Sequence, residues 1–75
     1  MQRDYSVSFI EIYVNGQARQ VPEGCNVARL LDQLDLTGQR IAAEINREIV
    51  PRSHYPLHTL HPGDRLEIVR AIGGG

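Results

Sequence analysis

The sequence contains no lysine and no tryptophan, and it has only one cysteine. A single cysteine excludes an internal disulfide framework and a four-cysteine zinc site. No apolar run approaches the ~20 residues of a membrane span, and the N-terminus has no signal-peptide pattern, so we expect a cytoplasmic protein. Eight basic and nine acidic residues leave a net charge of −1, which argues against a nucleic-acid or membrane partner.

The length and apolar content of the chain allow one small domain. A chain of 75 residues buries only about 60% of its unfolded surface, so its core must be compact. Its 20 Val, Ile and Leu residues suffice for one core layer between a sheet and a helix. All eight basic residues are arginine, a bias that genomic base composition explains without any function.

Two strands and a tight turn are expected at the start of the fold. Alternating apolar residues predict a half-buried strand over residues 8–14. Asn15-Gly16 suits a two-residue type I′ turn, because both central positions need a positive φ. Residues 17–21 then return as an antiparallel partner, in a register that places Val14 opposite Gln17.

One helix follows this hairpin. Asn26 is a suitable N-cap, because its side chain can accept a hydrogen bond from a free backbone N–H. Apolar residues then recur at i, i+3, i+4 and i+7, and this stripe consists of Val27, Leu30, Leu31 and Leu34. Gly38 is expected to end the helix or its exit turn.

The second half of the chain predicts further strands over residues 41–45, 48–50 and 65–72. Pro51 ends the short strand, because proline removes a backbone donor. Residues 52–61 are irregular and are expected to hold a short helical turn. In the last strand, Leu66 and Ile68 face one way, and Val69 and Ala71 face the other.

The element order β, β, α, β, short β, β limits the topology. A mixed sheet of four to five strands wrapped over a single helix buries the most apolar surface for so few residues. This α+β architecture is the β-grasp, which ubiquitin also uses. The helix between the second and third strands allows a crossover, so the first and last strands can lie parallel at the centre of the sheet.

Conventional catalytic and metal sites find little support. Cys25 comes just before the helix, where its simplest interpretation is a small residue near the helix cap. A thiol near a helix N-terminus can nevertheless have a lowered pKa. Three histidines, His54, His58 and His61, have spacings that suit metal ligands on a helix. Pro56 interrupts that stretch, so solvated loop histidines are the simpler interpretation.

The C-terminus offers a different kind of chemistry. Gly73, Gly74 and Gly75 follow directly from a predicted strand, a placement that neither a frayed end nor a cloning scar explains. Glycine has no Cβ and passes through a slot that other residues would block. Five extended residues reach about 17 Å, so a partner can draw in the terminal carboxylate and activate it as an acyl adenylate.

Several blocks of the sequence resemble the thiamine-biosynthesis sulfur carrier (ThiS) family, from about Phe9 to Gly75. The specific parts are "INREIVPRS" at residues 45–53 and "GDRLEIVRAIGGG" at residues 63–75. The Asn-Gly hairpin and the helix "VARLLDQL" at residues 27–34 agree with them. The resemblance implies a β-grasp fold over residues 1–72 and a flexible glycine tail over residues 73–75.

The same resemblance implies a carrier role rather than an enzyme. Gly75 would bear the sulfur as a thiocarboxylate, and Gly73 and Gly74 would form a flexible arm. A ubiquitin-activating-like adenylyltransferase would use ATP and Mg to activate Gly75, so this chain binds no cofactor of its own. A donor such as a cysteine desulfurase would supply the sulfur, which the carrier delivers to thiazole synthase for the thiazole of thiamine.

The surface that faces these partners is predicted next to the tail. Val69 and Ala71 point away from the helix, and Arg65 and Arg70 offer charges for acidic groups on an enzyme. Solvated strand residues are the alternative interpretation of these positions.

Three other functions remain open at this point. A molybdopterin-type sulfur carrier shares the fold and a diglycine end, although "NREIVPRS" resembles the thiamine branch. A ubiquitin-like modifier, which joins its C-terminus to lysines, shares the chemistry as far as the adenylate. A stand-alone interaction module of the same fold would not need its tail.

The missing lysines suggest one experiment. An activated C-terminus acylates amines, so a carrier without an ε-amine cannot form side-chain isopeptide bonds with its own copies. We expect a variant with one added surface lysine to form covalent dimers after activation, detected by intact-protein mass spectrometry. If dimers do not exceed the level of the parent chain, base composition is the sufficient explanation.

Overall fold

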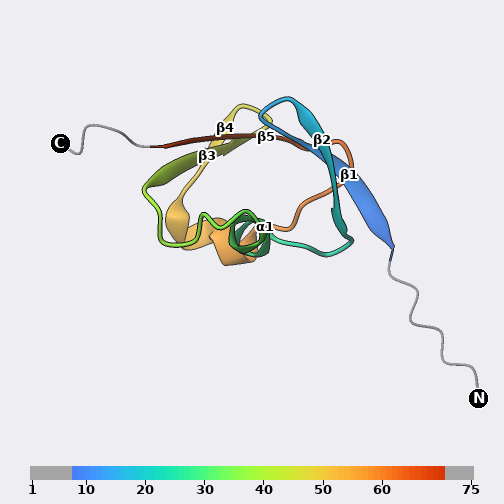
Figure 1. Ribbon diagram of the computed structural model, residues 1–75, viewed down its shortest axis with the longest axis horizontal. Helices are drawn as coiled ribbons and strands as arrows, with labels where there is room; N and C mark the ends of the chain where they lie inside the picture. Colours follow the sequence, from blue (N-terminus) through green and yellow to red (C-terminus); the bar gives the residue numbers. More distant parts are fainter. Residues whose placement is uncertain (1–7, 71–75) are drawn as a thin grey trace, which may run out of the picture.

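The computed structural model describes residues 8–70 and shows a curved sheet packed over one helix (Figure 1). The elements in chain order are β1 (Phe9–Val14), β2 (Gln17–Pro22), α1 (Val27–Gln33), β3 (Ile41–Ile45), β4 (Glu48–Val50), the 3₁₀ helix η1 (Arg52–Leu57) and β5 (Arg65–Arg70). The order agrees with the prediction, and η1 is the expected helical turn. No helix in this described part is long and apolar enough to cross a membrane.

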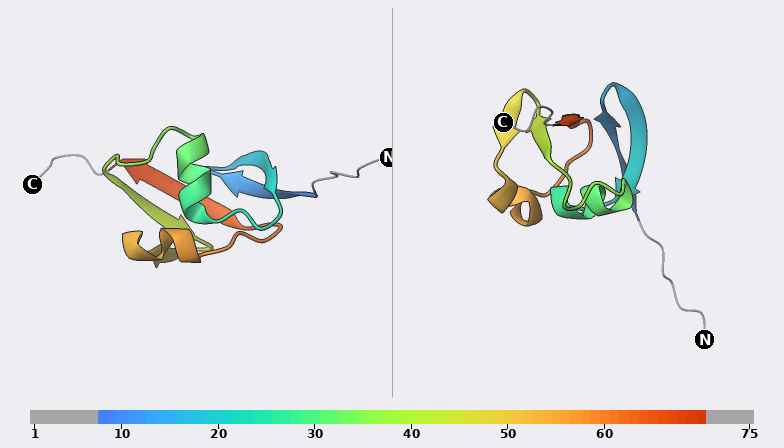
Figure 2. Two further views of the ribbon diagram at one scale, coloured as in Figure 1. Left: turned by 90° about the horizontal axis from the view of Figure 1, so that it is seen from below. Right: turned by 60° about the vertical axis from the view of Figure 1, so that its left-hand side comes forward.

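The five strands form one mixed sheet in the order β2-β1-β5-β3-β4 (Figure 2). β1 and β5 are parallel, and the other neighbouring pairs are antiparallel. The predicted parallel pair at the centre is therefore confirmed. Because β1 and β5 run the same way, Phe9 and Arg70 lie toward opposite ends of the sheet.

Both hairpins turn through residues with positive φ. Asn15 and Gly16 have φ values of 50° and 84°, and the predicted register of Val14 opposite Gln17 is confirmed. The β3–β4 turn uses Asn46 and Arg47, whose φ values are 51° and 73°. An arginine in this region is uncommon, since positive φ crowds its Cβ.

The helix begins as predicted, at Asn26, and ends in a motif that the sequence did not signal. The Asn26 side chain accepts a hydrogen bond from the backbone N–H of Arg29 at 2.8 Å. At the other end Leu34 is the C-cap, and the next residue, Asp35, has a φ of 60°. The backbone N–H of Leu36 donates to the Leu31 carbonyl at 2.8 Å, which completes a Schellman motif. Gly38, with a φ of 81°, lies in the exit turn, one of the two places predicted for it.

The core is a single layer between the sheet and the two helical elements. Its largest fully buried side chains come from β1, β2, α1, β5 and the loop after η1: Ile12, Val21, Val27, Leu30, Leu60 and Leu66. Burial of one such side chain stabilises the fold by roughly 1.5–3 kcal/mol. The predicted alternation along β5 is confirmed, because Leu66 and Ile68 are buried whereas Val69 is 58% exposed.

The Asn15 side chain extends the pairing of β1 with β5 beyond the end of β1. Its amide nitrogen donates to the Ile68 carbonyl at 3.1 Å, and its amide oxygen accepts from the Ile68 backbone N–H at 2.7 Å. The side-chain amide thus makes the two hydrogen bonds with Ile68 that the peptide groups of a longer β1 would make. On the other side of β5, Asn46 accepts a bond from the Arg65 N–H at 3.0 Å. Two turn asparagines therefore hold the central strand.

We expect Asn15→Gly to lower the free energy of unfolding by about 1–3 kcal/mol, because it leaves a partly buried N–H and C=O of Ile68 without partners. Glycine keeps the positive φ, so the turn itself is preserved. The matched control is Asn46→Gly, whose lost bonds are exposed to solvent and whose cost should be smaller. Urea denaturation measures both, and an equal or smaller loss at Asn15 would contradict this role.

Candidate functional site

The candidate site is the end of β5 from which the tail departs. Gly73, Gly74 and Gly75 lie outside the described residues, as do Ala71 and Ile72, so their predicted roles stay predictions. Arg70 is the last residue that the structure describes, and it closes β5 opposite Ile41 of β3. The antiparallel pairing with β3 continues to this last residue, so the tail starts from a fixed point of the sheet.

Val69 is an exposed apolar residue on the outer face of the sheet, close to the start of the tail. The side chain is 58% exposed and lies opposite Ala42, which is exposed as well. On the neighbouring strand β4, Ile49 is 73% exposed. Ile49 lies opposite Glu44, so the adjacent apolar pair on this face is Val69 with Ala42, a small candidate contact for another protein. The location of Val69 agrees with its predicted place on the outer face.

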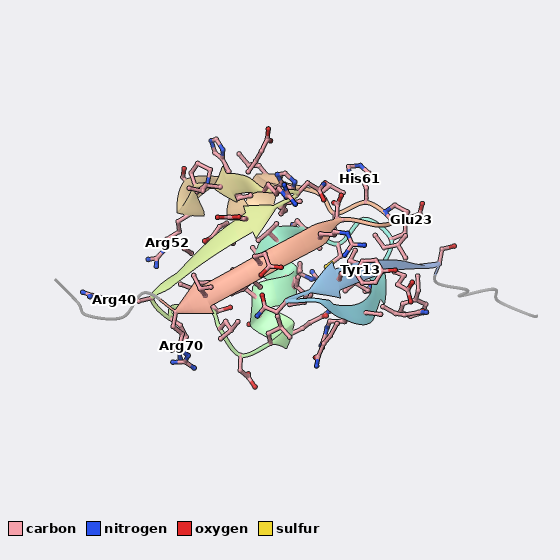
Figure 3. The ribbon with its side chains drawn as sticks, turned by 90° about the horizontal axis from the view of Figure 1, so that it is seen from above. Tyr13, Glu23, Arg40, Arg52, His61 and Arg70 are labelled. Carbon is pink, nitrogen blue, oxygen red and sulfur yellow. The ribbon has the colours of Figure 1, made fainter. Side chains whose placement is uncertain are left out.

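Two arginines meet at Gln39 on the end of the sheet. Arg70 donates from Nη1 to the side-chain oxygen Oε1 of Gln39 at 3.3 Å. Arg52, from η1, donates from Nη2 to the main-chain carbonyl of the same residue at 3.3 Å. Figure 3 shows Arg52 and Arg70 at this end of the molecule, together with Arg40. One uncharged residue therefore links two positive side chains from separate elements.

Arg65 lies apart from this group. It begins β5, whereas Arg70 ends it, and five residue steps along a strand span roughly 17 Å. Its guanidinium carbon stands 4.7 Å from the centroid of the Tyr13 ring, a cation–π contact with the neighbouring strand. Val69 and Arg70 are neighbours at the end of β5 on opposite faces of the strand, and Arg65 lies apart from both.

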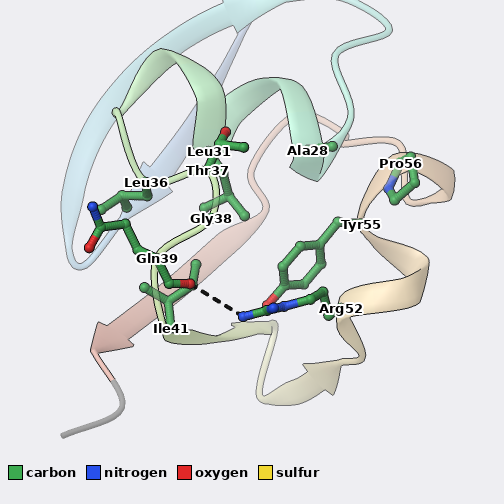
Figure 4. Close-up of a pocket in the computed structure, with 10 residues that line it drawn as sticks. All are labelled: Ala28, Leu31, Leu36, Thr37, Gly38, Gln39, Ile41, Arg52, Tyr55 and Pro56. Carbon is green, nitrogen blue, oxygen red and sulfur yellow. Dashed lines mark hydrogen bonds between the residues drawn. The ribbon is translucent and has the colours of Figure 1, made fainter.

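An open hollow of about 320 Å³ lies beside Arg52, between α1, η1 and the start of β3 (Figure 4). Its apolar lining includes Leu31, Leu36, Ile41 and Tyr55. The Leu36–Gln39 loop, which the Schellman motif directs away from the helix, forms one wall. This hollow is therefore a consequence of how α1 ends.

Cys25 corrects one expectation from the sequence. The residue is 7% exposed and belongs to the core, and its Sγ donates to the Asn26 carbonyl at 3.4 Å. Burial raises the pKa of this thiol, and the nearby Arg29 offsets part of that rise. The possibility of a lowered pKa was wrong, because desolvation of the thiol outweighs the opposing charge of Arg29.

The three histidines are distributed along η1 and the loop after it. His54 and His61 are exposed, and the carbonyl of His58 accepts a bond from the Val27 N–H at 3.0 Å. Within residues 8–70, no group of three His, Cys, Asp or Glu side chains is placed to hold a metal ion.

Comparison with known proteins identifies the family. The sequence profile of the ThiS family matches residues 12–75, which is most of the chain. The sulfur carrier protein ThiS of Escherichia coli K12 is 38% identical over 66 residues, which cover 88% of this chain and 100% of that protein. The chain belongs to the ThiS family.

Two further relatives are consistent with the ThiS assignment. The crystal structure of the thiamine biosynthesis protein ThiS from Geobacter metallireducens superposes with a TM-score of 0.77, at 30% identity over 88% of this chain and 100% of that one. Thiazole synthase of Paramagnetospirillum magneticum is 39% identical over 66 residues. This ThiS-family chain spans 20% of the length of that thiazole synthase. Together with the observed topology, these relatives confirm the predicted β-grasp fold.

Sequence reasoning missed the residues that fix the base of the tail in this ThiS-family fold. Gln39 joins Arg52 to Arg70 through contacts between residues 13 and 31 positions apart, and no local pattern signals them. Asn15 was recognised for its turn geometry, whereas its contact with Ile68 was not. The sequence did contain a signal for this contact. Glycine would also satisfy the turn at position 15, so an asparagine there offers a side-chain amide that the turn itself does not need.

The raised pKa of Cys25 predicts slow alkylation of its thiol at neutral pH. We expect iodoacetamide to alkylate the folded chain more slowly at pH 7 than the urea-unfolded chain, because burial lowers the thiolate fraction. Arg29→Gln removes the one influence that lowers this pKa, so its folded rate should fall further. A folded rate above the unfolded rate would show an activated thiol and contradict the assignment. Mass spectrometry of timed samples gives both rates.

Proposed function

We propose that this sulfur carrier of thiamine biosynthesis holds its sulfur as a thiocarboxylate on Gly75. The observation that carries the proposal is that the family match extends to residue 75 and therefore includes the terminal glycines. The chain is a carrier and not a catalyst, so the reactive group is its own terminus. Gly73 and Gly74 serve as an arm without side chains.

The chemistry divides into two displacement steps on the carboxylate. A carboxylate oxygen of Gly75 attacks the α-phosphorus of ATP, and pyrophosphate leaves. The terminal sulfur of a persulfide then attacks the carbonyl carbon, the C–O bond to the phosphate breaks, and AMP departs. A thiol cleaves the S–S bond of the resulting acyl disulfide, which releases the thiocarboxylate and leaves the two other sulfurs as a disulfide. Both displacement steps belong to a ubiquitin-activating-like adenylyltransferase that supplies ATP and Mg, with a donor such as a cysteine desulfurase upstream. The use of ATP makes the cytoplasm the expected location.

Thiazole synthase is the proposed acceptor of the sulfur. The ThiS-like segment within a thiazole synthase supports this pairing, since it places carrier and acceptor sequences in one protein. Val69, at the base of the tail, is the proposed apolar contact for both enzymes, and Ala71 would continue that face. Arg70 is the proposed charged contact, and Arg65, at the far end of β5, is a peripheral one.

We expect one bulky residue appended after Gly75 to abolish both the thiocarboxylate and thiazole formation, because the working carboxylate is displaced. Intact-protein mass spectrometry of chain isolated from its own cells should show, for the parent only, the mass gain of one sulfur replacing one oxygen. The control carries the same residue added before Met1.

Two results would overturn this function. Thiazole formation that survives the appended residue would make the tail dispensable and favour a stand-alone interaction module. Covalent adducts on other proteins, with no thiocarboxylate on the free chain, would favour a protein modifier.

A further inference from the structure

Three of the eight arginines gather where the tail leaves the sheet. We call Arg40, Arg52 and Arg70 the arginine cluster. All three are exposed, and Arg40 directly precedes Ile41, which lies opposite Arg70 in the β3–β5 register. The cluster therefore lies at the end of β5, and its three members come from three separate segments.

Within residues 8–70, the hydrogen bonds of Arg52 and Arg70 go to a neutral residue. Arg52 and Arg70 donate to two oxygens of the same residue, the main-chain and side-chain oxygens of Gln39, each at 3.3 Å. Both acceptors are neutral. Gln39 thus orients two guanidinium groups toward one end of the molecule and leaves their remaining N–H donors available.

The described segments at this end of the molecule are poor in acidic residues. Residues 36–43, 49–57 and 68–70 contain no Asp or Glu, although Asp35, Glu44, Glu48 and Glu67 border them. The chain as a whole carries nine acidic residues and a net charge of −1, so its acidic residues are concentrated in the other segments. The base of the tail is the locally positive part of a slightly acidic protein, and such a region attracts a negative partner.

The hollow beside Arg52 adds an apolar element to this charged end. Its lining by Leu31, Leu36 and Ile41 continues up to Gln39 and Arg52 themselves. At about 320 Å³ it is open and large enough to receive an apolar side chain from outside. The site therefore matches a segment in which an apolar residue accompanies acidic ones.

We propose that the arginine cluster binds carboxylate side chains of the adenylating enzyme at the entrance of the slot that takes the tail, with a neighbouring apolar side chain in the hollow. This inference rests on the proposed function and names the chemistry of that contact. A guanidinium pairs with a carboxylate through two parallel N–H···O bonds, which fixes orientation as well as charge. The contact would aim the tail into the slot.

Nucleotide phosphates are a poorer match for the same charges. A tail drawn through a slot is extended, and five residues then carry the Gly75 carboxylate about 17 Å beyond the sheet. The phosphorus that reacts with it lies equally far from Arg70. The cluster can contact the entrance while the chemistry occurs deeper in the enzyme.

The test compares two double variants in ATP–pyrophosphate exchange with the cognate adenylating enzyme. We expect Arg52→Gln with Arg70→Gln to raise the KM for the carrier by about tenfold with kcat unchanged, because the charges act on encounter and docking. The matched control, Arg19→Gln with Arg47→Gln, removes two exposed charges from β2 and the β3–β4 turn and should leave KM unaltered. Higher salt should raise the KM of the parent toward that of the Arg52→Gln/Arg70→Gln variant, because salt screens the charges.

The outcomes separate the two proposals. Exchange that is absent with the parent chain overturns the proposed function. Exchange that is normal with the parent and equally normal with Arg52→Gln/Arg70→Gln overturns only the arginine cluster. A raised KM for ATP, or an equal effect of the control pair, overturns it as well. Urea denaturation should show that both variants stay folded, since the bonds lost from Gln39 are exposed.

Discussion

The pairing of the Asn15 amide with Ile68 is the contact on which the working end of this protein depends. β1 stops at Val14, whereas β5 continues to Arg70, so the central strand would lose its partner on one side just before the tail. The side-chain amide supplies one further peptide-like group at that point, with bonds of 3.1 and 2.7 Å. β3 holds the opposite side as far as Arg70. A carrier whose chemistry occurs beyond its last strand needs that strand fixed, and a turn residue does this.

The residues that end the helix also shape the surface next to the tail. The Schellman motif after α1 directs the chain through Leu36 toward Gln39, which then bonds to arginines of η1 and β5. One loop thus forms a wall of the apolar hollow and sets the orientation of two charged groups. The same residues therefore build the fold and the proposed partner surface, and Arg52 and Arg70 are oriented while they stay exposed to solvent.

Most of the fold was predictable because its signals are local and agree with one another. Alternation gave the strands, Asn15-Gly16 gave the first turn, and Asn26 gave the start of the helix. The helix end was harder, since Asp35 rather than a glycine takes the left-handed position. The pKa of Cys25 depends on core burial, and the bonds of Gln39 join segments far apart in sequence, so neither follows from a local pattern. The terminal glycines stand out in the sequence itself, because their proposed role lies in the absence of side chains.

The parallel pairing of β1 with β5 has a practical consequence for how this carrier can be tethered. Phe9 begins one central strand, Arg70 ends the other, and the two strands point the same way, so the sheet's length separates these residues. A fusion partner or an immobilising surface attached close to Phe9 therefore starts from the end of the sheet opposite Arg70 and the proposed docking surface. Attachment through that side leaves the approach of a modifying enzyme sterically free, which an antiparallel central pair would not allow.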